Sequence, residues 1–99
     1  MNLKTAKESR SLVKPPRSNG LKAGFVLLKP GKTMPEHTTG NNEEFIYIIE
    51  GEAILEIEQR REVIRLKAGD YYYIPSRTVH AVVNSLSRDL RYIYVLALR

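Results

Sequence analysis

Three residues have side chains that could together bind a metal ion. His37 and His80 are the only histidines of the chain, and Glu44 follows His37 by seven residues. Neutral imidazole is the commonest nitrogen ligand for zinc, copper, iron and nickel. Two histidines and one carboxylate on the same face leave coordination positions open for water and substrate, which suits Lewis-acid or dioxygen chemistry. Taken alone, a histidine in a β-domain is more often a surface residue or a hydrogen-bonded core residue.

Length and composition restrict the other possibilities. Ninety-nine residues are enough for one domain with a single core. The absence of cysteine excludes disulfides and thiolate ligands, so a metal site must use nitrogen and oxygen donors. No apolar run approaches the roughly 18 residues that span a bilayer, and no hydrophobic signal segment begins the chain. We therefore expect a cytoplasmic protein without a membrane contact.

The net charge of +5 is concentrated at the N-terminus. Residues 1–22 contain six basic residues against Glu8 alone, whereas residues 23–99 are balanced. No aromatic residues alternate with these charges, as stacking on bases would require, which argues against nucleic acid as a partner. We divide the chain into a basic N-terminal arm, residues 1–20, and a β-domain, residues 21–99. The arm could be solvated, or it could pair as an edge strand with a partner subunit.

Short segments rich in β-branched and aromatic residues alternate with turn signals such as Lys29-Pro30-Gly31. No segment has a convincing helical period. This pattern predicts an all-β fold, and in 99 residues it means a sandwich or a barrel. The expected strands are 11–13 in the arm, then 23–28, 45–50, 53–58, 62–66, 71–74, 79–84 and 91–98.

Strand alternation predicts which residues face the interior. If Glu44 points inward, Ile46 and Ile48 do so too, because residues two apart share a face. The residues that then point outward are apolar as well: Phe45, Tyr47 and Ile49. The last strand is likewise apolar on both faces. An apolar outer face needs cover, which the arm or a second subunit could supply, and we expect a homodimer joined through these strands.

The spacing of glycine, histidine, glutamate and asparagine resembles the two motifs of the cupin superfamily. The first motif reads Gly31, His37, Thr39, Glu44, Gly51, and the second reads Gly69, Pro75, Arg77, His80, Asn84. Together they extend over residues 31–84, just over half of the chain. The resemblance is to small single-domain cupins. It implies a jelly-roll barrel, also called a double-stranded β-helix, with a divalent metal held by histidines and a glutamate.

Two positions depart from the family pattern. Thr39 stands where the family has its second histidine, and Arg77 stands where it has a glycine. The implied metal ligands are therefore His37, Glu44 and His80, with Thr39 as a fourth-ligand position that offers only a weak hydroxyl donor. The lost imidazole favours iron, manganese or zinc over nickel and copper, or it leaves a polar pocket without metal. The glycine loss is minor if Arg77 has a negative φ.

Other residues have weaker claims to a role in the site. Arg77 could anchor a carboxylate or phosphate, and a solvated loop arginine is an equal alternative. Tyr73 could hydrogen-bond a ligand, although a packing tyrosine is the plainer interpretation. Asn84 is expected to satisfy backbone groups in a turn. By strand parity, Glu36 and Glu43 should face away from the interior.

The resemblance leaves two classes of function open. One is a metal-dependent enzyme acting on a small oxygen-bearing metabolite, of the dioxygenase, sugar isomerase or decarboxylase type. The other is a non-catalytic ligand-binding or dimerisation cupin without a metal. Between them the sequence slightly favours a metal-bearing barrel, catalytic or not, and it does not choose among the enzyme types.

Overall fold

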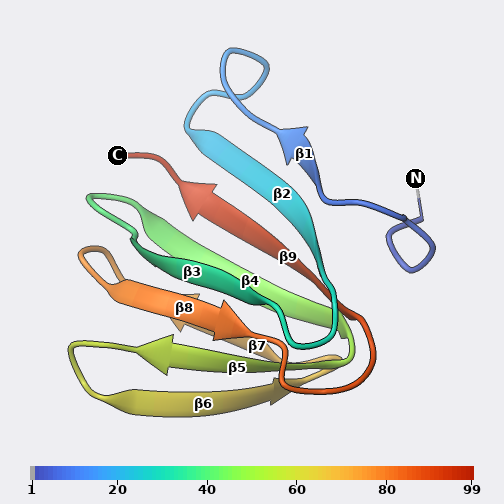
Figure 1. Cartoon of the computed structure of the whole chain (residues 1–99). Coiled ribbons are helices and arrows are strands. Elements are labelled where there is room, and N and C mark those ends of the chain that lie inside the picture. Colours follow the sequence, from blue (N-terminus) through green and yellow to red (C-terminus); the bar gives the residue numbers. More distant parts are fainter. Residues whose placement is uncertain (1) are drawn as a thin grey trace.

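Two antiparallel β-sheets pack face to face in the computed structural model, which describes residues 2–99 (Figure 1). One sheet has the strand order β1-β2-β9-β4-β7 and the other β3-β8-β5-β6. This arrangement confirms the expected all-β jelly-roll fold. The strands are β1 Arg10–Val13, β2 Leu21–Leu28, β3 Thr33–Thr38, β4 Glu43–Glu50, β5 Glu52–Ile57, β6 Glu62–Lys67, β7 Tyr71–Ile74, β8 Val79–Val83 and β9 Leu90–Ala97.

The core lies between the sheets and is made by alternate residues of each strand. On β4, Glu44, Ile46 and Ile48 are buried, whereas Phe45 and Tyr47 are 41% and 39% exposed. The predicted alternation of β4 is therefore confirmed. Residues from both sheets complete the buried cluster: Val26, Leu28, Ala53, Leu55, Ile57, Leu66, Ile74, Val82, Leu90 and Tyr92.

Most of the expected strands agree with the observed ones to within two residues. The exception is β3, Thr33–Thr38, which is not among the expected strands because its residues are mostly polar and it contains Pro35. Among the described residues, no helix is long and apolar enough to cross a membrane. The cytoplasmic location stays a prediction.

The N-terminal arm lies against the edge and the outer face of the five-stranded sheet. Its strand β1 pairs with β2 of the same chain, with Arg10 opposite Phe25. The Ser9 hydroxyl accepts a hydrogen bond from the Leu27 amide, and Ala6 is buried. Phe25 is consequently only 1% exposed, although it points away from the interior of the barrel. Residue 1 of the arm lies outside the described residues, and pairing with a partner subunit stays a prediction.

The loop before β8 contains the second departure from the family motif, Arg77. Arg77 has a φ of +56°, so the condition under which its replacement of glycine would be minor is not met. A left-handed conformation costs a residue with a Cβ about 1 kcal/mol relative to glycine. Two hydrogen bonds hold it there: the Arg77 amide donates to the Gly40 carbonyl, and Gln59 Nε2 donates to the Arg77 carbonyl.

Asn84 closes the barrel at the other end of β8. Its side chain is fully buried, and Nδ2 donates to the Leu28 carbonyl at 2.9 Å and to the Arg88 carbonyl at 2.8 Å. Its Oδ1 accepts from the Leu86 amide at 3.1 Å. One amide thus satisfies three backbone groups of two loops, which confirms the structural role predicted for Asn84.

Candidate metal centre

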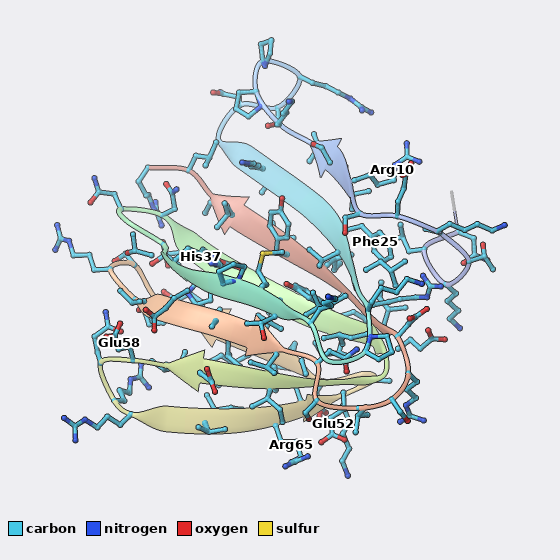
Figure 2. All side chains as sticks on the ribbon, viewed as in Figure 1. Arg10, Phe25, His37, Glu52, Glu58 and Arg65 are labelled. Carbon is cyan, nitrogen blue, oxygen red and sulfur yellow. The ribbon has the colours of Figure 1, made fainter. Side chains whose placement is uncertain are left out.

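The pairing of β3 with β8 brings the two histidines together. His37 lies directly opposite His80 across the two strands, and their ring centroids are 4.2 Å apart. Figure 2 labels His37. The register of β3 shifts between Met34 and His37: Met34 pairs with Val82 and His37 with His80, so β3 carries one extra residue. This β-bulge turns His37 toward the interior, although it lies an odd number of residues from Met34.

Glu44 reaches the histidines from the opposite sheet. Its position at the start of β4 places its carboxylate Oε1 3.3 Å from His80 Nε2. The ligand atoms of His37, Glu44 and His80 all lie within 4.8 Å of one another. Glu44 and His80 are buried, whereas His37 is exposed at the mouth of the site. The sequence-predicted ligand set is therefore assembled on one side of the barrel, with an open approach past His37.

Backbone carbonyls orient both imidazole rings. His80 Nδ1 lies 3.2 Å from the Thr78 carbonyl, and His37 Nδ1 lies 3.0 Å from the Pro35 carbonyl. In each case Nδ1 donates to a carbonyl two residues earlier, which leaves Nε2 with its lone pair free. Nε2 of His80 is buried and lacks a well-aligned hydrogen-bond partner among the described residues. A buried nitrogen lone pair facing a carboxylate fits a divalent metal ion.

In the absence of metal, a proton can occupy the space between His80 and Glu44. Burial, the largest single influence, lowers the pKa of His80, but the hydrogen bond and the charge of Glu44 together with the Thr78 carbonyl raise it above its ordinary value of 6.5. A metal ion must displace this proton to bind. Burial also raises the pKa of Tyr92, and the negative charge of Glu44 adds to that effect, so its phenol stays protonated.

The Thr39 hydroxyl connects two loops beside the site. It donates to the Pro75 carbonyl at 2.8 Å and accepts from the Thr78 amide at 3.1 Å, and the residue is only 5% exposed. Both bonds hold the loop that leads into β8, which positions the Thr78 carbonyl and hence the ring of His80. The structure thus gives Thr39 a positioning role, and its role as a fourth ligand stays a prediction.

A cavity of about 440 Å³ lies beside the metal-ligand group. Sequence reasoning missed three polar residues of its wall, Lys22, Tyr92 and Tyr94; the apolar alternation of the last strand was the available signal for the tyrosines. Glu36 lies at the cavity mouth beside His37, where the β-bulge interrupts the alternation of β3, and it is exposed. The other lining residues are Val26, Met34, Pro35, Thr38, Thr39, Asn42, Val82 and Leu96.

The two residues expected at a substrate site, Tyr73 and Arg77, do not line this cavity. Tyr73 lies on the outer face of β7, where it is 50% exposed and its hydroxyl donates to Glu43 Oε1 at 2.7 Å. Glu43 faces outward as expected. Arg77 lies in the loop between β7 and β8 and contacts Gly40 and Gln59 through its backbone. Their proposed contacts with a substrate stay predictions.

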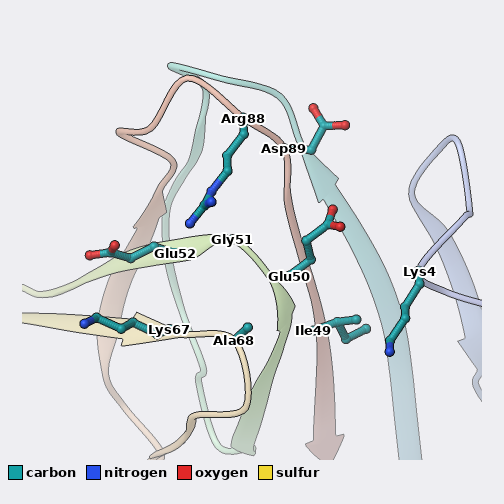
Figure 3. Close-up of a pocket in the computed structure, with 9 residues that line it drawn as sticks. All are labelled: Lys4, Ile49, Glu50, Gly51, Glu52, Lys67, Ala68, Arg88 and Asp89. Carbon is teal, nitrogen blue, oxygen red and sulfur yellow. The ribbon is translucent and has the colours of Figure 1, made fainter.

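A second hollow, of about 890 Å³, lies at the opposite end of β4 (Figure 3). Three cations and three carboxylates line it together with Ile49, Gly51 and Ala68. Each carboxylate pairs with a base outside the hollow: Glu50 with Arg91, Glu52 with Arg65, and Asp89 with Lys29. Figure 3 shows Lys4 and Lys67 on opposite sides, so the cations do not converge on one point. No histidine lines this hollow, and it is separate from the metal-ligand group.

Comparison with known families gives a match over most of the β-domain. The model of the cupin domain family matches residues 24–96. A curated protein of Streptomyces cyaneus, called polyketide synthase CurC, is 30% identical over 74 residues, which is 75% of this chain. The chain spans only 47% of that relative's length.

Solved structures support the same fold. The Cnp3 cupin domain of Schizosaccharomyces pombe has a TM-score of 0.86 at 19% identity, covering 99% of this chain and 68% of its own. A predicted oxalate decarboxylase from Thermotoga maritima has a TM-score of 0.73 at 26% identity, covering 79% of this chain and 66% of its own.

Proposed function

The chain belongs to the cupin family, and from this premise we propose that it is a metal-binding barrel that takes a small oxygen-bearing metabolite. In this proposal His37, Glu44 and His80 hold one divalent ion, and the metabolite enters past the exposed His37. The observation that carries the proposal is His80 Nε2, which is buried, lacks a well-aligned hydrogen-bond partner in residues 2–99 and lies 3.3 Å from Glu44 Oε1. Iron, manganese, zinc and nickel all accept this donor set.

The chemistry available at such a site is that of a Lewis acid or of dioxygen activation. The residues of this chain would supply the surroundings: two carbonyl-oriented histidines, a buried carboxylate and an apolar wall that includes Val26, Val82 and Leu96. The Thermotoga maritima relative is named for a decarboxylase of a small carboxylic acid. That name favours carbonyl or carboxylate chemistry among the dioxygenase, isomerase and decarboxylase types.

A specific observation also favours a non-catalytic alternative. The family pattern has another histidine where this chain has Thr39, and the Thr39 hydroxyl is already engaged by Pro75 and Thr78. With one imidazole fewer, metal affinity falls, and the same cavity would then serve as a ligand-binding pocket. A measurement of the metal content of the purified protein distinguishes the metal-binding function from the metal-free ligand-binding function.

We expect purified protein to contain about one equivalent of iron, manganese, zinc or nickel per chain, measured by elemental analysis after removal of loosely bound ions. The His37→Ala variant should lose most of this metal, because two ligands cannot hold the ion against buffer chelators. Glu36→Gln is the matched control, since Glu36 lies beside His37 at the cavity mouth without belonging to the ligand group. Absence of metal even after each ion is added back would contradict the metal site and leave the ligand-binding alternative.

We further propose that two copies of the chain associate through the outer face of the five-stranded sheet. Cross-strand rows on this face join Phe25, Ile93, Tyr47 and Tyr71, and then Ala23, Val95, Phe45 and Tyr73. The arm covers Phe25, but the β4 and β7 ends of both rows stay exposed. There the rings of Phe45 and Tyr71 stack, with their centroids 5.3 Å apart. Aromatic residues exposed side by side in this way are typical of an interface.

Light scattering on the purified chain should give twice the 11.3 kDa chain mass at micromolar concentration. Tyr47→Lys places a charge in the centre of the exposed rows and should shift the protein to monomer. Val63→Lys, at a 65% exposed apolar residue of the other sheet, should leave the mass unchanged. A monomeric wild-type protein would refute this interface.

A further inference from the structure

Tyr94 lies across the backbone of β2 on the cavity side of the barrel. Gly24 of β2 is the cross-strand partner of Tyr94 on β9. A Cβ at position 24 would clash with the ring and the hydroxyl oxygen of Tyr94. The absence of a side chain at Gly24 is therefore what allows the phenol to lie over β2, with its hydroxyl directly above the glycine.

Lys22 lines the same cavity as this hydroxyl. It lies two residues before Gly24, so its side chain projects from the same face of β2, and both Lys22 and Tyr94 line the cavity. Lys22 forms no ion pair with any carboxylate of the described chain, whereas Lys29, Arg65, Arg91 and Arg99 each do. Lys22 and Tyr94 thus place an ammonium group without an ion pair and a phenol hydroxyl in the wall of the same cavity.

The sheet register fixes how far this pair lies from the metal-ligand group. Lys22 is opposite Leu96, and Leu96 is opposite Glu44, so Lys22 and Glu44 are two strands apart on the same face. Two strand spacings amount to about 10 Å between backbones, and both side chains extend into the cavity between them. A molecule of a few carbon atoms could contact both ends.

We propose that Lys22 and Tyr94 form a carboxylate-binding subsite, so that the ligand of this cavity is a small carboxylic acid with a second oxygen group directed at His37, Glu44 and His80. The inference rests on the proposed metal site, and it specifies in addition that the ligand is negatively charged. A divalent ion with Glu44, the exposed Glu36 and Lys22 leaves the cavity with a net positive charge, which favours an anion. Lysine supplies the charge and the phenol donates a hydrogen bond to the second carboxylate oxygen.

The test compares acids with amides of the same shape. Lactate against lactamide, and malonate against malonamide, are titrated calorimetrically into metal-loaded protein. The wild type should bind at least one of the acids about tenfold or more tightly than its amide. Lys22→Met should abolish this preference and leave amide binding unchanged, Lys22→Arg should restore it, and Tyr94→Phe should weaken it several-fold. Lys32→Met, at an exposed lysine outside the cavity, is the matched control.

The outcomes separate this inference from the proposed function. Metal content and thermal unfolding are measured on every variant, and neither should change in Lys22→Met. Equal affinity for acids and amides in the wild type, or an unchanged preference in Lys22→Met, overturns the subsite while leaving the metal site intact. If the wild type holds no metal, the metal site fails, and the same titrations on the metal-free protein still decide whether Lys22 selects carboxylates.

Discussion

Replacing Asn84 with alanine should lower the free energy of unfolding by about 3 kcal/mol or more. The substitution removes three buried hydrogen bonds and leaves the Leu28 and Arg88 carbonyls and the Leu86 amide without their partner. Each buried polar group left unsatisfied costs about 1–3 kcal/mol, and the vacated volume adds to the loss. Urea denaturation followed by circular dichroism measures the change.

Asn19→Ala provides the matched control, because Asn19 is exposed in the turn before β2. Its unfolding free energy should stay within about 0.5 kcal/mol of the wild type. A loss below about 1 kcal/mol in Asn84→Ala would mean that water replaces the amide at the barrel end, and that Asn84 does not hold the loops together.

Metal affinity should fall about tenfold for each pH unit below the pKa of His80. The ion and the proton compete for the same nitrogen, so each further unit of acidity multiplies the competing protonated form tenfold. Burial lowers the pKa of His80, but the hydrogen bond and charge of Glu44 raise it above 6.5, so the decline should begin above pH 6.5. A competitive titration against a chromogenic chelator between pH 5 and 8 measures it.

The stability of the metal-free protein should change with pH in the opposite sense to its metal affinity: it should fall as pH rises. Its His80 has a raised pKa when folded, so the stabilisation from the protonated pair is complete below the unfolded value of 6.5 and is lost as pH rises through the folded value. The thermal stabilisation produced by adding metal should therefore grow with pH.

Glu44→Gln tests the cause of this pH dependence. It removes the carboxylate that raises the pKa of His80 but leaves the burial that lowers it. The pH at which metal affinity declines should shift to a lower value, and affinity at neutral pH should drop about 100-fold with the loss of a charged ligand. An unchanged pH profile would show that His80 is not the group that titrates.

The fold and the ligand group could be predicted because their signals are local in the sequence. The spacing of Gly31, His37, Glu44 and Gly51 lies within one stretch of chain, and this spacing identified Glu44 as a ligand, whereas alternation along β4 left both faces apolar. Asn84 was likewise expected to satisfy backbone groups in a turn. The pairing of β3 with β8 was then the one further condition for assembling the metal-ligand group.

The cavity wall could not be predicted because it depends on contacts between distant segments. Lys22 was assigned by its charge to the basic N-terminal region, and its place beside Tyr94 follows only from the register of β2 against β9, about 70 residues later. The bulge in β3 was also missed, because strand parity assumes an uninterrupted strand. Pro35 was the available signal, since proline inside a strand is found at edges or bulges.

The extra residue in β3 makes the metal-ligand group depend on how one strand pairs with its neighbour as well as on the residues of that strand. From Met34 to His37, β3 advances by three residues, whereas β8 advances by two between their partners Val82 and His80. If β3 kept its length but paired with β8 without the bulge, His37 would lie on the opposite face from Met34 and point to solvent. A β3 shorter by one residue between these positions would not need the bulge, because regular alternation would then place the histidine on the same face as Met34.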